Sequence, residues 1–405
     1  MRISRRLQDL GQSDIRRMTR ECERVSGINL GQGICDLPTP PLVREGALAA
    51  IRADKSVYSF AEGAIELRTA IARKLSRDNG ITADPASEIC VTVGASGAYT
   101  STIHALLDPG DGIVLFEPYY GYHLNAAVVA GLVPQFVTLN APSFALDEAA
   151  LDAAIDARTR AIVLCTPSNP SGKMFSADEI ELVARVARKH DLFLITDEIY
   201  EYIRYDGRPH ISPATIAPER TVSIMGLSKT FSITGWRLGY AVAPAPLCKA
   251  ITLVSDLFYV CAPTPLQLGA ARGFDSPRSY FDDLATSYLK KRDAICSALD
   301  AAGLSPIVPQ GAYYVLADCS SLGQSDARSA AMHLLETSGV ASVPGSAFYR
   351  TAGEKLLRFC FAKDDAVLEE ACRRLRSRTG ARPTAPADGS RTAAAGPGAS
   401  RTALG

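Results

Sequence analysis

The sequence predicts an α/β fold: a mostly parallel sheet with helices on both faces, joined to a smaller α+β domain. Two observations indicate the sheet. Short runs rich in β-branched residues alternate with segments of helical periodicity along most of the 405 residues. These runs are almost wholly apolar, as expected of strands that are buried on both faces. A third observation, a long helical pattern followed by a shorter mixed unit ending near residue 375, indicates the smaller domain.

The predicted elements follow from local signals. Four apolar runs are expected to be core strands, namely residues 89–93, 113–116, 161–164 and 192–195. Between the last two, Ser176 and Glu179 form a capping box, and apolar residues at helical spacing follow it. A long helix is predicted over residues 277–302, with Ser276 as its cap and Pro277 at its first helical position.

The chain is long enough for one large and one smaller domain. We expect residues 1–45 to form an N-terminal arm and part of the small domain. Residues 46–284 are predicted to form the large domain, and residues 285–376 the C-terminal small domain. Residues 377–405 are almost entirely Ala, Gly, Pro, Ser, Thr and Arg without apolar periodicity, so they are predicted to be a disordered tail.

Composition narrows the range of partners. The 43 basic and 43 acidic residues leave no net charge, which argues against a nucleic-acid partner. No apolar run approaches the length of a membrane span. The ten cysteines form no C-x-x-C pair and no metal-ligand spacing with histidine, so we expect no metal and buried thiols in a reducing cytoplasm.

The first 17 residues are rich in arginine but lack the apolar core of a secretory signal. Asp9 and Asp14 argue against a transit peptide. We therefore expect an arm that lies on the protein or on a partner subunit.

Lys229 is the most informative single residue. It follows the apolar run 221–225 and stands among small hydroxylated residues, with Arg237 eight positions later between two glycines. An amine in such a place can condense with an aldehyde, and a guanidinium can pair with a phosphate as a planar double donor. The pattern suits a Schiff base to a phosphorylated aldehyde cofactor.

Other polar residues fall where predicted strands end, which is where open α/β sheets bind ligands. Asp197 follows one strand and could keep a pyridinium nitrogen protonated. Tyr200 and Asn169 could reach the neighbouring ring oxygen. The small residues 94–98 open a helix and leave N–H groups free for a phosphate. Taken singly, each signal is equally well explained as a helix cap or a tight turn.

The order of these residues resembles that of the fold-type-I pyridoxal-phosphate enzymes, specifically the class I/II aminotransferases of the aspartate, aromatic and kynurenine type. The segment Ser-Lys-Thr-Phe-Ser-x-Thr-Gly-Trp-Arg-x-Gly-Tyr at residues 228–240 is a long and specific match. The resemblance extends from about residue 27 to residue 375, which is nearly the whole chain that is expected to fold.

The resemblance implies a role for each matching position. Lys229 would form the internal aldimine with pyridoxal 5'-phosphate and shuttle the proton, and Asp197 would pair with the pyridine nitrogen. Arg358 would clamp the substrate α-carboxylate beside Gly33. The other implied cofactor contacts are Asn169 and Tyr200 at the ring oxygen, Tyr119 stacked on the ring, Ala95, Ser96, Ser228 and Arg237 around the phosphate, and Tyr58 reaching the phosphate of the other subunit.

The implied activity is ping-pong transfer of an amino group from an L-amino acid to a 2-oxo acid, by a cytoplasmic homodimer of amino-acid metabolism with sites at its interface. A C–S lyase or another eliminating enzyme on the same fold is the alternative, and an oxidase is a third variant. A cofactor-binding sensor would need a DNA-binding segment, and we expect no room for one before residue 27. No second arginine for a distal carboxylate can be assigned from the sequence, so acidic, aromatic and neutral substrates stay open.

One position departs from the pattern. Gly226 stands three residues before Lys229, where relatives usually carry a serine that donates to the phosphate. The sequence therefore predicts that the phosphate is bound by one hydrogen bond fewer than in these relatives. A hydrogen bond to a charged acceptor contributes about 1.5–3 kcal/mol.

Overall fold

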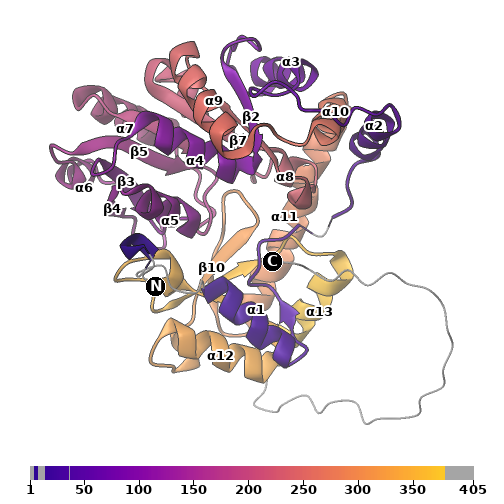
Figure 1. The fold of residues 1–405 in the computed structure, drawn as a ribbon. Coiled ribbons are helices and arrows are strands. Elements are labelled where there is room, and N and C mark those ends of the chain that lie inside the picture. Colours follow the sequence, from indigo (N-terminus) through magenta and orange to yellow (C-terminus); the bar gives the residue numbers. More distant parts are fainter. Residues whose placement is uncertain (1–3, 8–13, 36, 379–405) are drawn as a thin grey trace.

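The computed structural model describes residues 4–7, 14–35 and 37–378, which fold into two lobes (Figure 1). The larger lobe is built on a seven-stranded sheet in the order β2-β8-β7-β6-β5-β3-β4. Within this sheet, β8 alone runs opposite to the other six strands, so the prediction of a mostly parallel sheet is confirmed. The strands are β2 (Ile89–Val93), β3 (Gly112–Glu117), β4 (Val133–Thr138), β5 (Thr159–Cys165), β6 (Phe193–Asp197), β7 (Thr221–Gly226) and β8 (Leu238–Val242).

The predicted core strands correspond to β2, β3, β5 and β6; β8 was not predicted, and neither was β4. This strand lies at the edge of the sheet, contains Pro134 and is only partly buried along most of its length. Proline is tolerated at a sheet edge because one side of the strand needs no ladder hydrogen bond. The weak apolar signal of β4 is thus a consequence of its edge position.

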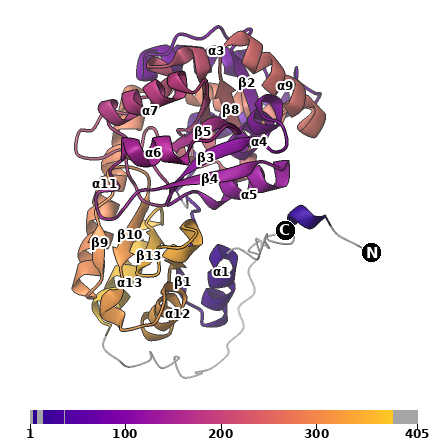
Figure 2. The same ribbon diagram turned by 90° about the vertical axis from the view of Figure 1, so that its left-hand side faces the viewer.

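Helices cover both faces of this sheet (Figure 2). One face shares a buried apolar cluster with α4 (Gly94–Leu106), α5 (Gly121–Ala130) and α9 (Ala245–Tyr259). A second cluster joins α6 (Glu148–Ala154) and α7 (Ala177–Lys189) to the other face. The predicted capping box of α7 is present, since Glu179 N donates to Ser176 Oγ at 3.2 Å and Ser176 N donates to Glu179 Oε2 at 2.9 Å.

The smaller lobe contains an antiparallel four-stranded sheet in the order β12-β13-β10-β9. Its strands are β9 (Ser305–Ile307), β10 (Tyr314–Asp318), β12 (Val343–Pro344) and β13 (Leu356–Cys360), and a two-stranded parallel sheet pairs β1 (Ile28–Asn29) with β11 (Val340–Ala341). The helices of this lobe are α1 (Asp14–Arg24), α12 (Ala327–Ser338) and α13 (Asp365–Arg376). The expectation of a smaller α+β unit is confirmed.

The long helix α11 (Arg278–Ala301) runs from the larger lobe into the smaller one (Figure 2). It begins one residue later than predicted, because Pro277 is the N-cap in place of Ser276. The remaining longer helices are α2 (Pro41–Arg52), α3 (Ile65–Lys74) and α10 (Thr264–Gly273). The short helical segments are η1 (Arg5–Leu7), η2 (Leu75–Asn79), η3 (Pro213–Thr215), η4 (Pro218–Arg220), α8 (Leu227–Thr230), η5 (Thr234–Trp236), η6 (Ser320–Leu322) and η7 (Gly345–Phe348).

The predicted tail lies outside the described residues from position 379 onward. Within the described ranges, no helix is both long enough and apolar enough to cross a membrane. No group of three or more His, Cys, Asp or Glu side chains is placed to hold a metal ion in this part of the chain. In the predicted N-terminal arm, Arg6 Nη1 donates a hydrogen bond to the carbonyl oxygen of Val129 on α5 at 2.6 Å.

Candidate active site

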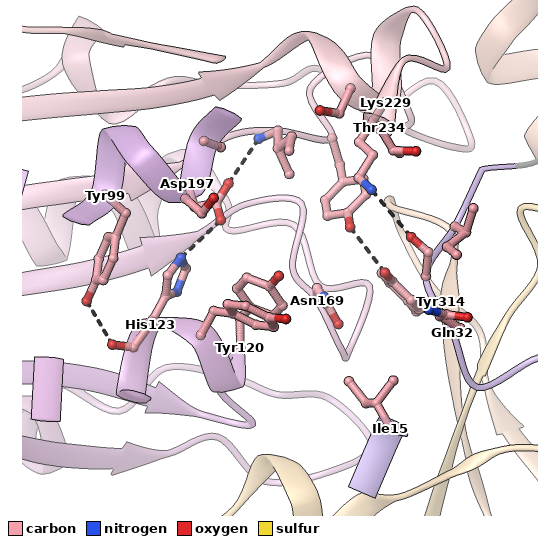
Figure 3. Close-up of a pocket in the computed structure, with 18 of the residues that line it drawn as sticks. Ile15, Gln32, Tyr99, Tyr120, His123, Asn169, Asp197, Lys229, Thr234 and Tyr314 are labelled. Atoms are coloured by element: carbon pink, nitrogen blue, oxygen red, sulfur yellow. Dashed lines mark hydrogen bonds and ion pairs between the residues drawn. The ribbon is translucent and has the colours of Figure 1, made fainter. Parts of the chain in front are cut away.

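A cavity of about 370 Å³ opens at the carboxyl ends of the parallel strands, on the side of the larger lobe that faces the smaller one (Figure 3). Small-molecule sites typically enclose about 300–1,000 Å³. Ten of the twelve residues that the sequence proposed for the site line this cavity, namely Gly33, Ala95, Ser96, Asn169, Asp197, Tyr200, Ser228, Lys229, Arg237 and Arg358. The other two, Tyr58 and Tyr119, do not line it.

Lys229 lies on α8, the single helical turn that follows β7, and its side chain is half-buried. Its Nζ donates to the carbonyl oxygen of Gly33 at 3.4 Å (Figure 3). Burial lowers the pKa of Lys229 below its ordinary value, and Arg237 acts in the same direction, while Asp197 and two thiols oppose the change. A lysine with a lowered pKa has more neutral amine at physiological pH, which is the form that attacks carbonyl carbon and accepts protons.

This pKa shift leads to a test on the cofactor-free protein. We expect the reaction of Lys229 with a small aldehyde, trapped by borohydride, to rise with pH and to reach half its maximum below the ordinary lysine value of 10.5. The reason is that burial penalises the charged form, so the amine loses its proton at lower pH. Mass spectrometry can compare its labelling with that of Lys290, which is exposed on α11. A midpoint for Lys229 at or above 10.5 would contradict the assignment.

Asp197 ends β6, and both oxygens of its buried carboxylate have a partner. Oδ2 lies 3.0 Å from Nε2 of His123, and Oδ1 accepts the Ile199 N–H at 3.2 Å. His123 is also buried, and the hydroxyl of Tyr99 donates to its carbonyl at 3.2 Å (Figure 3). The carboxylate is therefore held in one orientation at the wall of the cavity.

His123 was not predicted from the sequence. The residue stands on α5 three positions after Tyr120, so it lies one helical turn from the neighbour of Tyr119, the tyrosine proposed from the sequence. That spacing is the one local signal that was available. The contact with Asp197 joins residues 74 positions apart, which no local pattern shows.

Arg358 projects from β13 and is almost fully buried, with 1 % of its surface exposed. Its Nη1 donates to Asn169 Oδ1 at 3.0 Å and its Nη2 to the carbonyl of Gly31 at 2.6 Å. The guanidinium lies between the rings of Tyr314 and Phe348, with its central carbon 4.4 and 4.8 Å from their centroids. Its Nε has no partner among the described residues, so this cation keeps donors for an anion.

Asn169 and Tyr200 approach the cavity from the loops that follow two neighbouring strands, β5 and β6. Because Arg358 occupies the amide oxygen of Asn169, the amide nitrogen is left to donate into the cavity. The Tyr200 hydroxyl donates to that of Tyr314 at 3.3 Å. Burial raises the pKa of Tyr200 well above its ordinary value and that of Tyr314 to about 12, so both phenols keep their protons and can donate. Tyr314 was not predicted from the sequence.

At the other end of the cavity, Ala95 and Ser96 occupy the first turn of α4. Arg237 donates to Ser96 Oγ at 3.1 Å and to the carbonyl of Thr234 at 3.0 Å. Gly94 has a φ of +72°, and a Cβ there would lie 2.5 Å from Nη2 of Arg237. Only glycine leaves room for this approach. A helix N-terminus beside a guanidinium forms a cradle for a doubly charged anion such as a phosphate ester.

Gly226 has a steric explanation. A Cβ at this position would lie 2.6 Å from two carbon atoms of the Ile199 side chain, and Ile199 itself lines the cavity. The apolar side chain therefore fills the space in which a serine would stand. Ser228 is buried and lines the cavity at the same end.

Tyr119 and Tyr120 lie differently with respect to the main cavity. Tyr120, not Tyr119, lines the main cavity, with its ring 5.2 Å from that of His123. Tyr119 lies in a smaller neighbouring cavity, 5.7 Å from the ring of Phe136. The chain is extended between β3 and α5, so adjacent side chains point in opposite directions. Tyr58 is 79 % exposed and does not reach the cavity of its own chain.

Comparisons with known proteins agree with this geometry. Residues 25–375 match the family model of the class I and II aminotransferases. The chain is 36% identical over 380 residues to kynurenine–oxoglutarate transaminase 3 of Mus musculus, an alignment that covers 85% of this chain and 83% of the mouse protein. It is 36% identical over 351 residues to the aspartate/prephenate aminotransferase of Thermus thermophilus, which covers 86% of this chain and 89% of that one.

Solved structures give the same result. The N-succinyldiaminopimelate aminotransferase of Mycobacterium tuberculosis superimposes with a TM-score of 0.90 at 33% identity, covering 94% of this chain and 100% of that one. A methionine aminotransferase of Escherichia coli gives a TM-score of 0.89 at 31% identity, with 93% and 99% covered. All these relatives are named as enzymes of amino-group transfer, which does not favour the eliminating lyase. The chain belongs to the class I and II aminotransferases, and it is a transferase that moves an amino group between an amino acid and a 2-oxo acid.

Proposed function

We propose that this transfer depends on pyridoxal 5'-phosphate, held by the residues around the cavity. The observation that carries the proposal is one cavity that combines a lysine of lowered pKa, a fixed buried carboxylate and a phosphate cradle. When bound, the cofactor supplies an electrophilic carbon that accepts the amino group and a ring that withdraws electrons. Arg237, Ser96 and the backbone N–H of Ala95 would hold the phosphate, with Ser228 beside them.

The opposite edge of the cofactor would meet the polar groups at the strand ends. Asp197 would pair with the ring nitrogen and keep it protonated, because a buried carboxylate stabilises a nearby positive charge. The amide nitrogen of Asn169 would donate to the ring oxygen. The hydroxyl of Tyr200 would do the same once its proton turns from Tyr314 to the cofactor. Tyr120 is the aromatic residue that we propose to pack on the ring, in the role that the sequence analysis gave to Tyr119.

Arg358 would bind the α-carboxylate of the substrate as a planar double donor, next to the backbone of Gly33. Fixing this group orients the Cα–H bond for cleavage. Lys229, whose lowered pKa increases the share of neutral amine, would take the α-proton and hold it until it is returned. The amino acid leaves as a 2-oxo acid, and a second 2-oxo acid is aminated by the reverse steps, which is a ping-pong scheme.

A panel of amino acids tests this proposal. Each is mixed with the loaded enzyme in the absence of a 2-oxo acid, while absorbance reports the conversion of the cofactor from its aldehyde to its amine form. We expect one 2-oxo acid to be formed per converted site with at least one amino acid. Release of ammonia without need of an amino acceptor would contradict transfer and support elimination. Protein that binds no pyridoxal phosphate would contradict the cofactor assignment.

We further propose a homodimer with active sites at its interface. Large apolar side chains are strongly exposed at two places, one in the loop before α3 and one on α9: Val57, Tyr58, Phe60, Leu253 and Leu257, which are 63 to 79 % exposed. Exposed apolar groups of this kind mark contact surfaces. A second copy would cover them and place its Tyr58 near the phosphate cradle of the first copy.

The variant Tyr58→Phe tests the shared site. We expect the affinity for pyridoxal phosphate to fall roughly tenfold to hundredfold, the worth of one hydrogen bond to a charged acceptor. Fluorescence titration measures the affinity, and sedimentation shows whether the variant still dimerises. A dimer of unchanged affinity would contradict the role of Tyr58, and a fully active monomer would contradict the dimer itself.

We propose the cytoplasm as the compartment and amino-acid metabolism, in a biosynthetic process, as the setting. All ten cysteines are free thiols, which suits a reducing compartment.

A further inference from the structure

The cavity carries one more cation than the proposed chemistry uses. Four cationic side chains line it, namely Arg16, Lys229, Arg237 and Arg358, whereas Asp197 is its one acidic lining residue among those that the structure describes. The proposed function, on which this inference rests, assigns Arg237 to the cofactor phosphate, Arg358 to the α-carboxylate and Lys229 to the proton. Arg16 has no anion.

Arg16 stands in the first turn of α1, on the side of the cavity formed by the smaller lobe. The same helix is anchored by Met18 and Cys22, which are each 2 % exposed in the core. This anchoring turns Ile15 and Arg16 towards the cavity mouth (Figure 3 labels Ile15, opposite Asn169 and Tyr120). Ile15 is half-buried, while Arg16 is exposed.

No described residue neutralises Arg16. The acidic residue closest to it in sequence, Asp14, accepts two hydrogen bonds of 3.2 Å from Arg328, so its charge is already paired. Arg16 makes no hydrogen bond or ion pair within the ranges that the structure describes. A guanidinium at a cavity mouth without a partner keeps its planar set of donors for a ligand.

Apolar side chains form part of the wall of the same cavity. Ile15, Ile34 and the ring of Tyr122 line it, together with Gln32. This wall suits the methylene groups of a short side chain, and the guanidinium suits a carboxylate at its end. We propose that Arg16 binds the distal carboxylate of the substrate, and that the enzyme acts on dicarboxylic amino acids and their 2-oxo acids.

The test compares substrates of equal size that differ in charge. We expect the wild type to favour L-glutamate over L-glutamine in the amino-acid half-reaction. Arg16→Gln should lower kcat/KM for glutamate roughly tenfold to hundredfold, the worth of one charged hydrogen bond, and leave glutamine unchanged within about twofold. Arg17→Gln is the matched control, because Arg17 is an exposed arginine of the same helix that does not line the cavity.

A binding experiment separates this inference from the proposed function. Calorimetry on the loaded enzyme compares glutarate, which has two carboxylates, with valerate, which has one. Arg16→Gln should weaken the binding of glutarate and leave the binding of valerate unchanged, whether or not any half-reaction occurs. An equal loss of affinity for both ligands would overturn the role of Arg16, and so would an equal effect of Arg17→Gln. A wild type that favours glutamine or an aromatic amino acid as substrate would overturn it as well. Absence of any half-reaction, with the glutarate effect intact, would overturn only the proposed function.

Discussion

Replacing Lys229 with alanine is expected to abolish amino-group transfer, with kcat falling by roughly 10⁴ or more, because proton transfer and covalent chemistry are lost together. Lys229 is the one lysine that lines the cavity among the described residues, so no neighbouring amine can take over. The half-reaction with an amino acid, followed by absorbance, measures the loss. Turnover retained by the variant would refute the whole assignment of the site.

Two controls make this result specific. Lys290→Ala removes an exposed lysine of α11 and should leave kcat unchanged. Borohydride reduction of the loaded wild type should fix the cofactor on the peptide that contains Lys229, and mass spectrometry should find no such product in Lys229→Ala. A small added amine, such as methylamine, should restore part of the activity because it can accept the α-proton. Cofactor fixed on another lysine would contradict the assignment.

Asp197→Asn should lower kcat/KM by roughly 10²–10³, the usual cost of removing one electrostatic stabiliser from a preorganised site. The substitution keeps the shape of the side chain and removes its charge. An amide can still occupy the position between His123 and Ile199, so the fold should persist. Steady-state kinetics measure the loss, and thermal unfolding checks the fold.

The neighbouring carboxylate provides a matched control. Glu198 is fully buried, but it pairs with His210 at 2.7 Å and with the hydroxyls of Thr196 and Ser212, and it does not line the cavity. Burial would raise the pKa of Glu198, yet the hydrogen bond from His210 and the charge of that histidine bring it below its ordinary value. Glu198→Gln should cost stability, about 3 kcal/mol for a broken buried pair, and change kcat little. Similar losses of activity in both variants would contradict the role of Asp197.

Several features were predictable because their signals are local. The strands β2, β3, β5 and β6 are apolar runs bounded by turns, and a capping box marks the N-terminus of helix α7. Asp197 and Asn169 follow predicted strands, and parallel strands bring such ends to one edge of the sheet. The residues around Lys229 and Arg237 form a continuous segment, so their spacing was visible without any knowledge of the fold.

Other features depend on contacts between distant segments. The choice between Tyr119 and Tyr120 rested on which way an extended loop is turned, and the sequence shows two equivalent tyrosines. His123 and Tyr314 were overlooked because their partners, Asp197 and Tyr200, lie 74 and 114 positions away. The reason for Gly226 also appeared only when Ile199 was seen to fill the space beside it.

The sequence by itself determined the alternating fold, the family resemblance and the chemistry of the central residues, because strand periodicity and a continuous segment of the chain encode them. Only the tertiary structure decided which side chains share the cavity. The clearest case is Arg16, which the sequence shows as one of several arginines in a basic arm. Burial of Met18 and Cys22 fixes the rotation of α1 and so brings Arg16 to a site whose lysine lies more than 200 positions away.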